Sequence, residues 1–112
     1  MKTLKLKPWM KDDLLWGKKT KTWRMFDEKN LGLGDEVQFM DSEINEPIAV
    51  AVITEVAEKK FGEISETDFD GHNPYPSREA MFETYRGYYG DQVNWDTSIK
   101  MITFQLKEKL CE

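Results

Sequence analysis

The chain has 112 residues, of which 39% are hydrophobic, and a formal net charge of −5. This length and apolar content support one compact core, so we expect a single domain covering residues 1–112. No apolar run approaches the roughly 18 residues of a membrane-spanning helix, and the N-terminus lacks the apolar block of a signal peptide. A lone cysteine, Cys111, permits no internal disulfide, so we expect a cytoplasmic protein that does not contact membranes.

The charge is unevenly spread along the chain. Residues 1–24 carry a net charge of +6, whereas the remainder carries −11. A basic pole on an acidic body argues against wrapping long nucleic acid, because many phosphate contacts need a broad positive surface. It still permits local capture of one phosphate, one nucleotide or a short single strand. The alternative is a solvated edge of lysines with no ligand.

Two strands and a helix are expected at the basic end of the chain. Apolar and charged residues alternate over residues 3–7, which predicts a half-buried strand. A helix over residues 8–16 follows, since proline fits the first turn of a helix. Its periodicity predicts that Trp9 and Met10 face the core. A second strand is expected over residues 18–25.

The rest of the chain predicts three further strands, over residues 36–40, 48–60 and 98–106. The strand at 48–60 begins apolar on both faces, so we place it in the centre of the sheet. A short helical turn is expected over residues 66–69. A longer helix is expected between an N-cap at Ser77 and a stop at Gly90. The apolar residues at helical spacing on this helix are expected in the core: Met81, Phe82, Tyr85, Tyr88 and Tyr89.

This order of elements predicts an α+β fold. Too few helices separate the strands for a parallel doubly wound sheet. Consecutive strands without crossover helices pair antiparallel. We therefore expect a small, mostly antiparallel β-barrel of five to six strands, with two to three helices covering its ends.

The most reactive stretch is residues 17–24, Gly-Lys-Lys-Thr-Lys-Thr-Trp-Arg. Glycine tolerates the left-handed conformation that ends a helix, so the stretch forms a helix-to-strand turn. A threonine hydroxyl becomes a nucleophile when a base takes its proton, and a neutral lysine is such a base if its pKa falls. The charges of Lys18, Lys21 and Arg24 disfavour the ammonium form of Lys19. Lys19 can act on Thr22 only if it belongs to the turn, because strand alternation would point it away.

Several of these residues resemble the signature of the ASCH family, a branch of the PUA-like superfamily. They are Lys11-Asp12-Asp13-Leu14-Leu15, Gly17, Lys19, Thr20, Thr22 and Arg24. Looser likenesses are Leu33-Gly34-Asp35-Glu36-Val37, Asp70-Gly71-His72 and the final strand Ile99 to Leu106. The nearest likeness is to the small bacterial N4-acetylcytidine amidohydrolases of that family.

The resemblance implies a PUA-like barrel whose partner is a modified pyrimidine nucleoside or a short single-stranded RNA. It also implies hydrolysis of the N4-acetyl amide, with Lys19 as base, Thr22 as nucleophile and Asp70 as a distant carboxylate. The relatives carry glutamate at the last position, and residues 73–76 look inserted. The acids Glu63, Glu66 and Asp68 therefore stay alternatives to Asp70.

The remaining candidates are substrate-binding groups. We expect base stacking or phosphate contacts from Trp16, Lys18, Lys21, Trp23 and Arg24, with Tyr75 as a further stacking candidate. No metal or other cofactor is expected, because one His and one Cys far apart do not form a usual zinc site. Two alternatives to the amidohydrolase stay open. One is a non-catalytic RNA-binding module, and the other is a ribonuclease that uses the same basic cluster.

Overall fold

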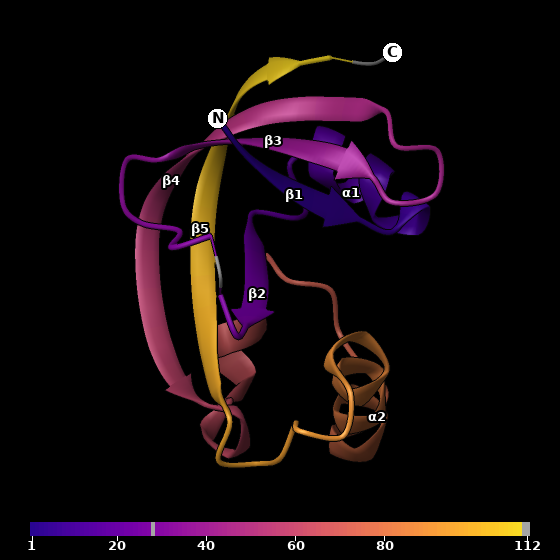
Figure 1. The fold of residues 1–112 in the computed structure, drawn as a ribbon, viewed down its shortest axis with the longest axis vertical. Helices are drawn as coiled ribbons and strands as arrows, with labels where there is room; N and C mark the ends of the chain where they lie inside the picture. The colour runs from indigo at the N-terminus through magenta and orange to yellow at the C-terminus, as the bar shows by residue number, and fades with distance from the viewer. Residues whose placement is uncertain (28, 111–112) are drawn as a thin grey trace.

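The computed structural model describes residues 1–27 and 29–110, so Cys111 lies outside the described residues. Its elements form a curled five-stranded sheet with helices on one side (Figure 1). The strands are β1 (Lys2–Leu6), β2 (Lys21–Met25), β3 (Glu36–Asp41), β4 (Pro47–Lys60) and β5 (Ser98–Lys109). The helices are α1 (Lys11–Leu15) and α2 (Arg78–Tyr89), and the 3-10 turns are η1 (Pro8–Met10), η2 (Phe61–Glu63) and η3 (Glu66–Phe69).

The strand order in the sheet is β1-β3-β4-β5-β2. Strand β1 pairs parallel with β3, and the other three pairings are antiparallel. The expected α+β fold with a small, mostly antiparallel barrel-like sheet is therefore confirmed, the sheet being a curled half-barrel, and β4 has the expected central place. Strands β1 and β2 form the two edges of the sheet.

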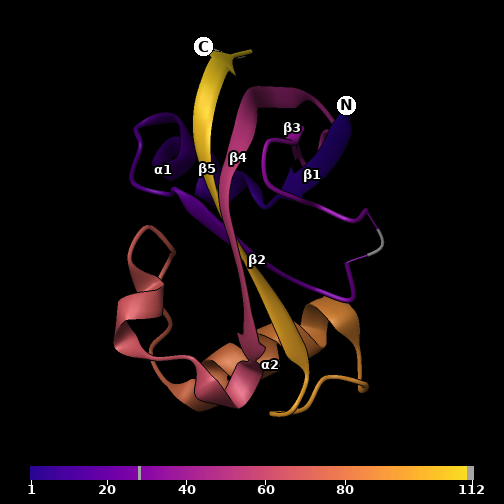
Figure 2. The same ribbon diagram turned by 90° about the vertical axis from the view of Figure 1, so that its left-hand side faces the viewer.

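A long ribbon of β4 and β5 is the spine of the molecule, and the two strands run side by side in both views (Figures 1 and 2). Their register shifts between Val50 and Ala51 and again between Ile53 and Glu55. Such bulges bend a strand and increase its twist. The bends curl the sheet and bring its two edges onto the same side.

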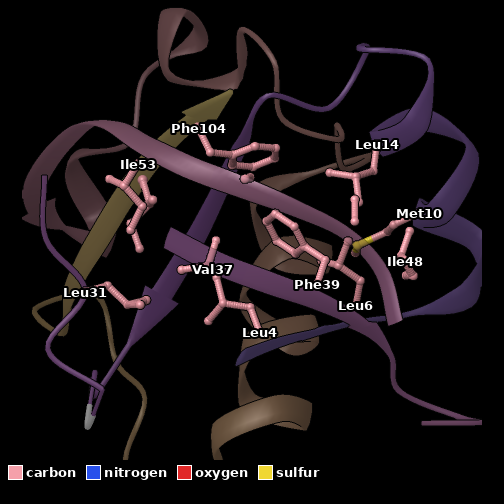
Figure 3. Packing of buried hydrophobic residues seen from close by; sticks show 13 residues of the cluster. Leu4, Leu6, Met10, Leu14, Leu31, Val37, Phe39, Ile48, Ile53 and Phe104 are labelled. Atoms are coloured by element: carbon pink, nitrogen blue, oxygen red, sulfur yellow. The ribbon is translucent and has the colours of Figure 1, made fainter. Parts of the chain in front are cut away.

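The apolar residues divide into two clusters along this ribbon. The first lies between β1, β3, β4 and α1, where Phe39 and Phe104 face each other with ring centroids 4.8 Å apart (Figure 3). Met10 and Leu14 cover it from η1 and α1 (Figure 3). The second cluster lies between α2 and the β2–β5 pair and centres on Trp23, Phe61 and Tyr85.

Helix α2 has the expected ends. The Ser77 hydroxyl accepts a hydrogen bond from the Ala80 amide at 3.0 Å, and Gly90 follows the last turn with φ +91°. Met81 and Tyr85 are buried as expected. Tyr88 is 44% exposed, so the expectation that it lies in the core is wrong. It sits two turns after Met81 near the C-terminal end, where the helix passes the rim of a cavity described below.

The expectation for Trp9 is also wrong, since its side chain is 60% exposed, whereas Met10 is buried. The chain does not form one α-helix from Pro8 to Trp16. It forms a 3-10 turn and then a short α-helix. A 3-10 turn has 3.0 residues per turn, so a helical wheel drawn with 3.6 residues per turn assigns Trp9 to the wrong face.

No helix among the described residues is both long and apolar enough to cross a membrane.

Candidate functional site

A cavity of about 280 Å³ lies where the edge strands β1 and β2 face each other across the open side of the sheet. Arg24 on β2 bridges this opening, because its Nη2 donates to the Lys5 carbonyl of β1 at 3.2 Å. Helix α2 and the segment after η3 supply the remaining walls. The lining residues are Lys5, Leu6, Lys7, Met10, Lys19, Thr22, Trp23, Arg24, Ser42, His72, Asn73, Tyr75, Tyr85, Tyr88 and Tyr89.

The turn after α1 directs Lys19 into this cavity. The Lys18 and Lys19 amides both donate to the Asp13 carbonyl at 2.9 Å, and Gly17 takes φ +80°. Strand β2 begins only at Lys21, so Lys19 belongs to the turn and not to the expected strand over residues 18–25. The condition under which Lys19 and Thr22 can share a pocket is therefore met.

A second segment is fixed to the same turn through Gly71. Its carbonyl accepts hydrogen bonds from the Thr20 and Lys21 amides at 2.8 and 3.0 Å. Gly71 has φ +80°, and a Cβ added there would collide with the Thr20 hydroxyl. This close approach brings His72 and Asn73 against Lys19, which lies more than fifty residues earlier in the chain.

The side chain of Lys19 is buried, and the pKa of its amine is lowered. Its side chain is 4% exposed, and its Nζ donates to Asn73 Oδ1 at 3.3 Å. Burial, and after it the charge of Arg24, lower the pKa of Lys19 from 10.5 to about 8, while the Asp13 carboxylate acts in the opposite direction. About one tenth of a group with that pKa is neutral at pH 7, which is enough for it to accept protons.

Thr22 lines the same cavity from β2 and is also 4% exposed. Its strand is held by pairing with β5, where Thr22 is opposite Ile102. No hydrogen bond within the described residues joins Lys19 Nζ to Thr22 Oγ1. The two groups share one cavity without a hydrogen bond between them, and catalytic hydrogen bonds are often long in ligand-free enzymes.

An aromatic wall stands beside this pair. The rings of Trp23 and His72 stack with centroids 3.8 Å apart and an angle of 15° between their planes. The Nδ1 of His72 lies 2.8 Å from the Asn73 carbonyl, which only accepts, so Nδ1 donates. Burial, and after it the charge of Lys19, lower the pKa of His72 to about 3. The ring is therefore neutral at pH 7, and its Nε2 carries a lone pair.

The predicted site residues divide into two groups. Lys19, Thr22, Trp23, Arg24 and Tyr75 line the cavity. Trp16, Lys18, Lys21 and Asp70 do not. Trp16 is 79% exposed, and Lys18 and Asp70 are also exposed.

None of the alternative acids lines the cavity either. Asp68 forms an ion pair with Lys59 at 2.8 Å, and Glu63 and Glu66 are exposed. The described lining thus contains no carboxylate, although the resemblance implies one. Asp70 keeps its expected role only as a prediction, without support from this geometry.

Sequence reasoning gave no role to Asn73 and none of the site roles to His72. Both residues directly follow Asp70-Gly71, so their position next to this motif could have marked them as candidates for the site.

Within residues 1–27 and 29–110, no three His, Cys, Asp or Glu side chains are grouped so that they could hold a metal ion.

The sequence matches no family model and no curated protein. Its structure is similar to solved structures. An ASCH domain from Lactobacillus crispatus has a TM-score of 0.69 and 16% identity, covering 88% of this chain and 70% of that chain. A protein of family DUF984 from Enterococcus faecalis has a TM-score of 0.71 and 19% identity, covering 92% and 72%. ASCH from Zymomonas mobilis has a TM-score of 0.66 and 12% identity, covering 92% and 65%.

These similarities show that the chain has the ASCH-domain fold, in agreement with the resemblance seen in the sequence. At such identities they show the fold alone.

Proposed function

We propose that the cavity binds a modified pyrimidine nucleoside, alone or within a short single-stranded RNA, and that Lys19 and Thr22 hydrolyse its N4-acetyl amide. The observation that supports this most directly is the placement of a buried, partly neutral lysine and a threonine hydroxyl in one cavity. The ASCH-domain fold is compatible with the proposal.

The cavity walls suit a nucleobase. Tyr75 and Tyr88 line the cavity and neither residue is fully buried, and stacking a base on an aromatic ring contributes roughly 1–3 kcal/mol. Asn73 and the Nε2 of His72 are uncharged polar groups of the kind that pair with the edge of a base. A pocket that combines aromatic walls with a few polar groups is typical of small-molecule sites.

The proposed reaction has two halves. Neutral Lys19 takes the proton of the Thr22 hydroxyl as Oγ1 attacks the acetyl carbonyl. The tetrahedral intermediate collapses when Lys19 returns the proton to N4, so cytidine leaves and an acetyl ester remains on Thr22. Water then attacks that ester with Lys19 again as base, which releases acetate and restores the hydroxyl. No step uses a carboxylate.

Release of cytidine from N4-acetylcytidine, followed by chromatography, tests the proposal. Thr22→Val keeps the shape of the side chain and removes the nucleophile, and Lys19→Met removes the base. We expect each to lower turnover by about 10²–10⁴-fold, the usual contribution of general-base help. The matched controls are Thr54→Val and Lys60→Gln, on the exposed part of β4 and away from the cavity. Absence of release by the folded wild type, or full activity of Thr22→Val, would refute the hydrolase proposal.

A binding module without catalysis is the second candidate. Four cationic residues line the cavity, Lys5, Lys7, Lys19 and Arg24, and no described carboxylate accompanies them. This candidate predicts salt-dependent binding of short RNA that weakens when Lys18, Lys19 and Lys21 are neutralised together. An assay for cleavage of single-stranded RNA separates it from a ribonuclease that uses the same cations.

A further inference from the structure

The cations of the cavity are concentrated at its β1 side and lack acidic partners. Lys5 and Lys7 come from β1 and the segment just after it, and Arg24 reaches across from β2. None of the three belongs to any ion pair found among the described residues. All three belong to residues 1–24, which carry a net charge of +6 on a protein whose overall net charge is −5.

Three buried polar groups of the cavity-lining residues have no hydrogen-bond partner among the described residues: the Trp23 indole N–H, Arg24 Nε and the Ser42 hydroxyl. No described residue accepts a hydrogen bond from Arg24 Nε, and none bonds to the hydroxyl of Ser42. A buried polar group left unpaired costs roughly 1–3 kcal/mol, so proteins seldom keep such groups without a use for them. Of the five N–H donors of the Arg24 guanidinium, one has a hydrogen-bond partner among the described residues.

The backbone places these groups around one short segment. The Ser42 amide donates to the Leu6 carbonyl at 2.9 Å, and Arg24 donates to the neighbouring Lys5 carbonyl. Lys7 follows, with its Nζ 5.9 Å from the centre of the Tyr88 ring. Arg24 and Ser42 thus contact the backbone of residues 5 and 6, and Lys5, Lys7, Arg24 and Ser42 all line the cavity.

We propose that Arg24, Lys5, Lys7 and Ser42 form a phosphate subsite, so that this cavity binds a nucleotide carrying a phosphate more tightly than the free nucleoside. Arginine matches the oxygens of a phosphate in two-pronged geometry, and the lysines add point charges. The inference rests on the proposed function for the identity of the base. Its evidence for the phosphate is independent of Lys19 and Thr22 chemistry.

Titrations with four compounds test this subsite: ribose 5-phosphate, cytidine, cytidine 5′-monophosphate and the dinucleotide CpC. Calorimetry at low salt gives the affinities, and the amide and Trp23 indole N–H signals in NMR report on the cavity. We expect saturable shifts with ribose 5-phosphate. We also expect cytidine 5′-monophosphate to bind about 10- to 100-fold more tightly than cytidine, as hydrogen bonds to charged groups imply.

Arg24→Gln should reduce the ratio of the affinity for cytidine 5′-monophosphate to that for cytidine to about threefold or less. Lys60→Gln removes one exposed positive charge outside the cavity lining and should leave the ratio unchanged. Comparison of CpC with cytidine 5′-monophosphate tells whether the phosphate belongs to an RNA backbone or to a mononucleotide.

The inference is overturned if ribose 5-phosphate gives no saturable shift and the monophosphate binds no better than cytidine. Cytidine binding in that case leaves the proposed function standing. If ribose 5-phosphate binds but neither cytidine compound binds more tightly than it does, the subsite stands and the pyrimidine assignment is lost.

Discussion

The contact between Gly71 and Thr20 gives a sharp test of how the site is assembled. Gly71→Ala places a methyl group at φ +80° and against the Thr20 hydroxyl. The left-handed conformation costs a residue with a Cβ about 1–2 kcal/mol. If the methyl group also pushes the segment away, the hydrogen bonds from the Thr20 and Lys21 amides to the Gly71 carbonyl weaken, at about 0.5–1.5 kcal/mol each. We expect a total loss of about 2–5 kcal/mol in the free energy of unfolding.

Gly34→Ala is the matched control for this measurement. Gly34 has φ +85°, but a Cβ added there meets no atom within 4 Å. It should therefore lose only the conformational term of about 1–2 kcal/mol. Urea denaturation followed by tryptophan fluorescence gives both values. Equal losses for the two variants would show that Gly71 does not clamp the His72–Asn73 segment to the turn.

Four further outcomes follow from the cavity. Turnover should rise with pH through about 8 as Lys19 loses its proton, and an activity that stays flat from pH 6 to 9 would contradict a lysine base. The pKa of Lys19 is lower in the folded than in the unfolded state, so the cost of its buried charge, roughly 3 kcal/mol, is fully present below pH 8. It is relieved between pH 8 and 10.5, and the gain in unfolding free energy over that range should vanish in Lys19→Met. The pKa of His72 is likewise lowered in the folded state, from 6.5 to about 3, so the protein loses stability as pH falls below 6.5. His72→Gln should reduce the loss of unfolding free energy between pH 6.5 and 4.5 by about 2–3 kcal/mol. Asp70→Asn should change turnover less than about twofold, because the carboxylate lies outside the cavity lining; a hundredfold drop would instead support the catalytic role that the sequence resemblance implies.

Local signals made the secondary structure predictable. The N-cap at Ser77 and the stop at Gly90 bound α2 as expected, and η3 covers the expected residues 66–69. Such ends depend on a few neighbouring residues and their backbone conformations. The failure at Trp9 has the same local origin, because a change from 3-10 to α geometry within one segment alters the periodicity that assigns a buried face.

The site was only partly predictable, since its walls come from distant parts of the chain. Lys19, Thr22, Trp23 and Arg24 are close in sequence, and their placement in one cavity follows from a single turn and strand. The hydrogen bond from Lys19 to Asn73 joins residues 54 positions apart. The parallel pairing of β1 with β3, which creates the β1 wall, also has no signature in local periodicity. Such partners become visible only when the chain is folded.

The open gap between the edge strands β1 and β2 affects how copies of the protein associate with one another. Each of these border strands has one side without a neighbouring strand in the described sheet, and such a side is a template onto which a foreign strand can add. Lys5, Lys7 and Arg24 stand along that gap, and charged residues on a border strand discourage this addition. The same side chains would thus bind the phosphate of a ligand and oppose pairing with the same edge of another copy of the chain. Neutralising all three at once should therefore cause concentration-dependent self-association, visible by light scattering, even where the fold itself survives.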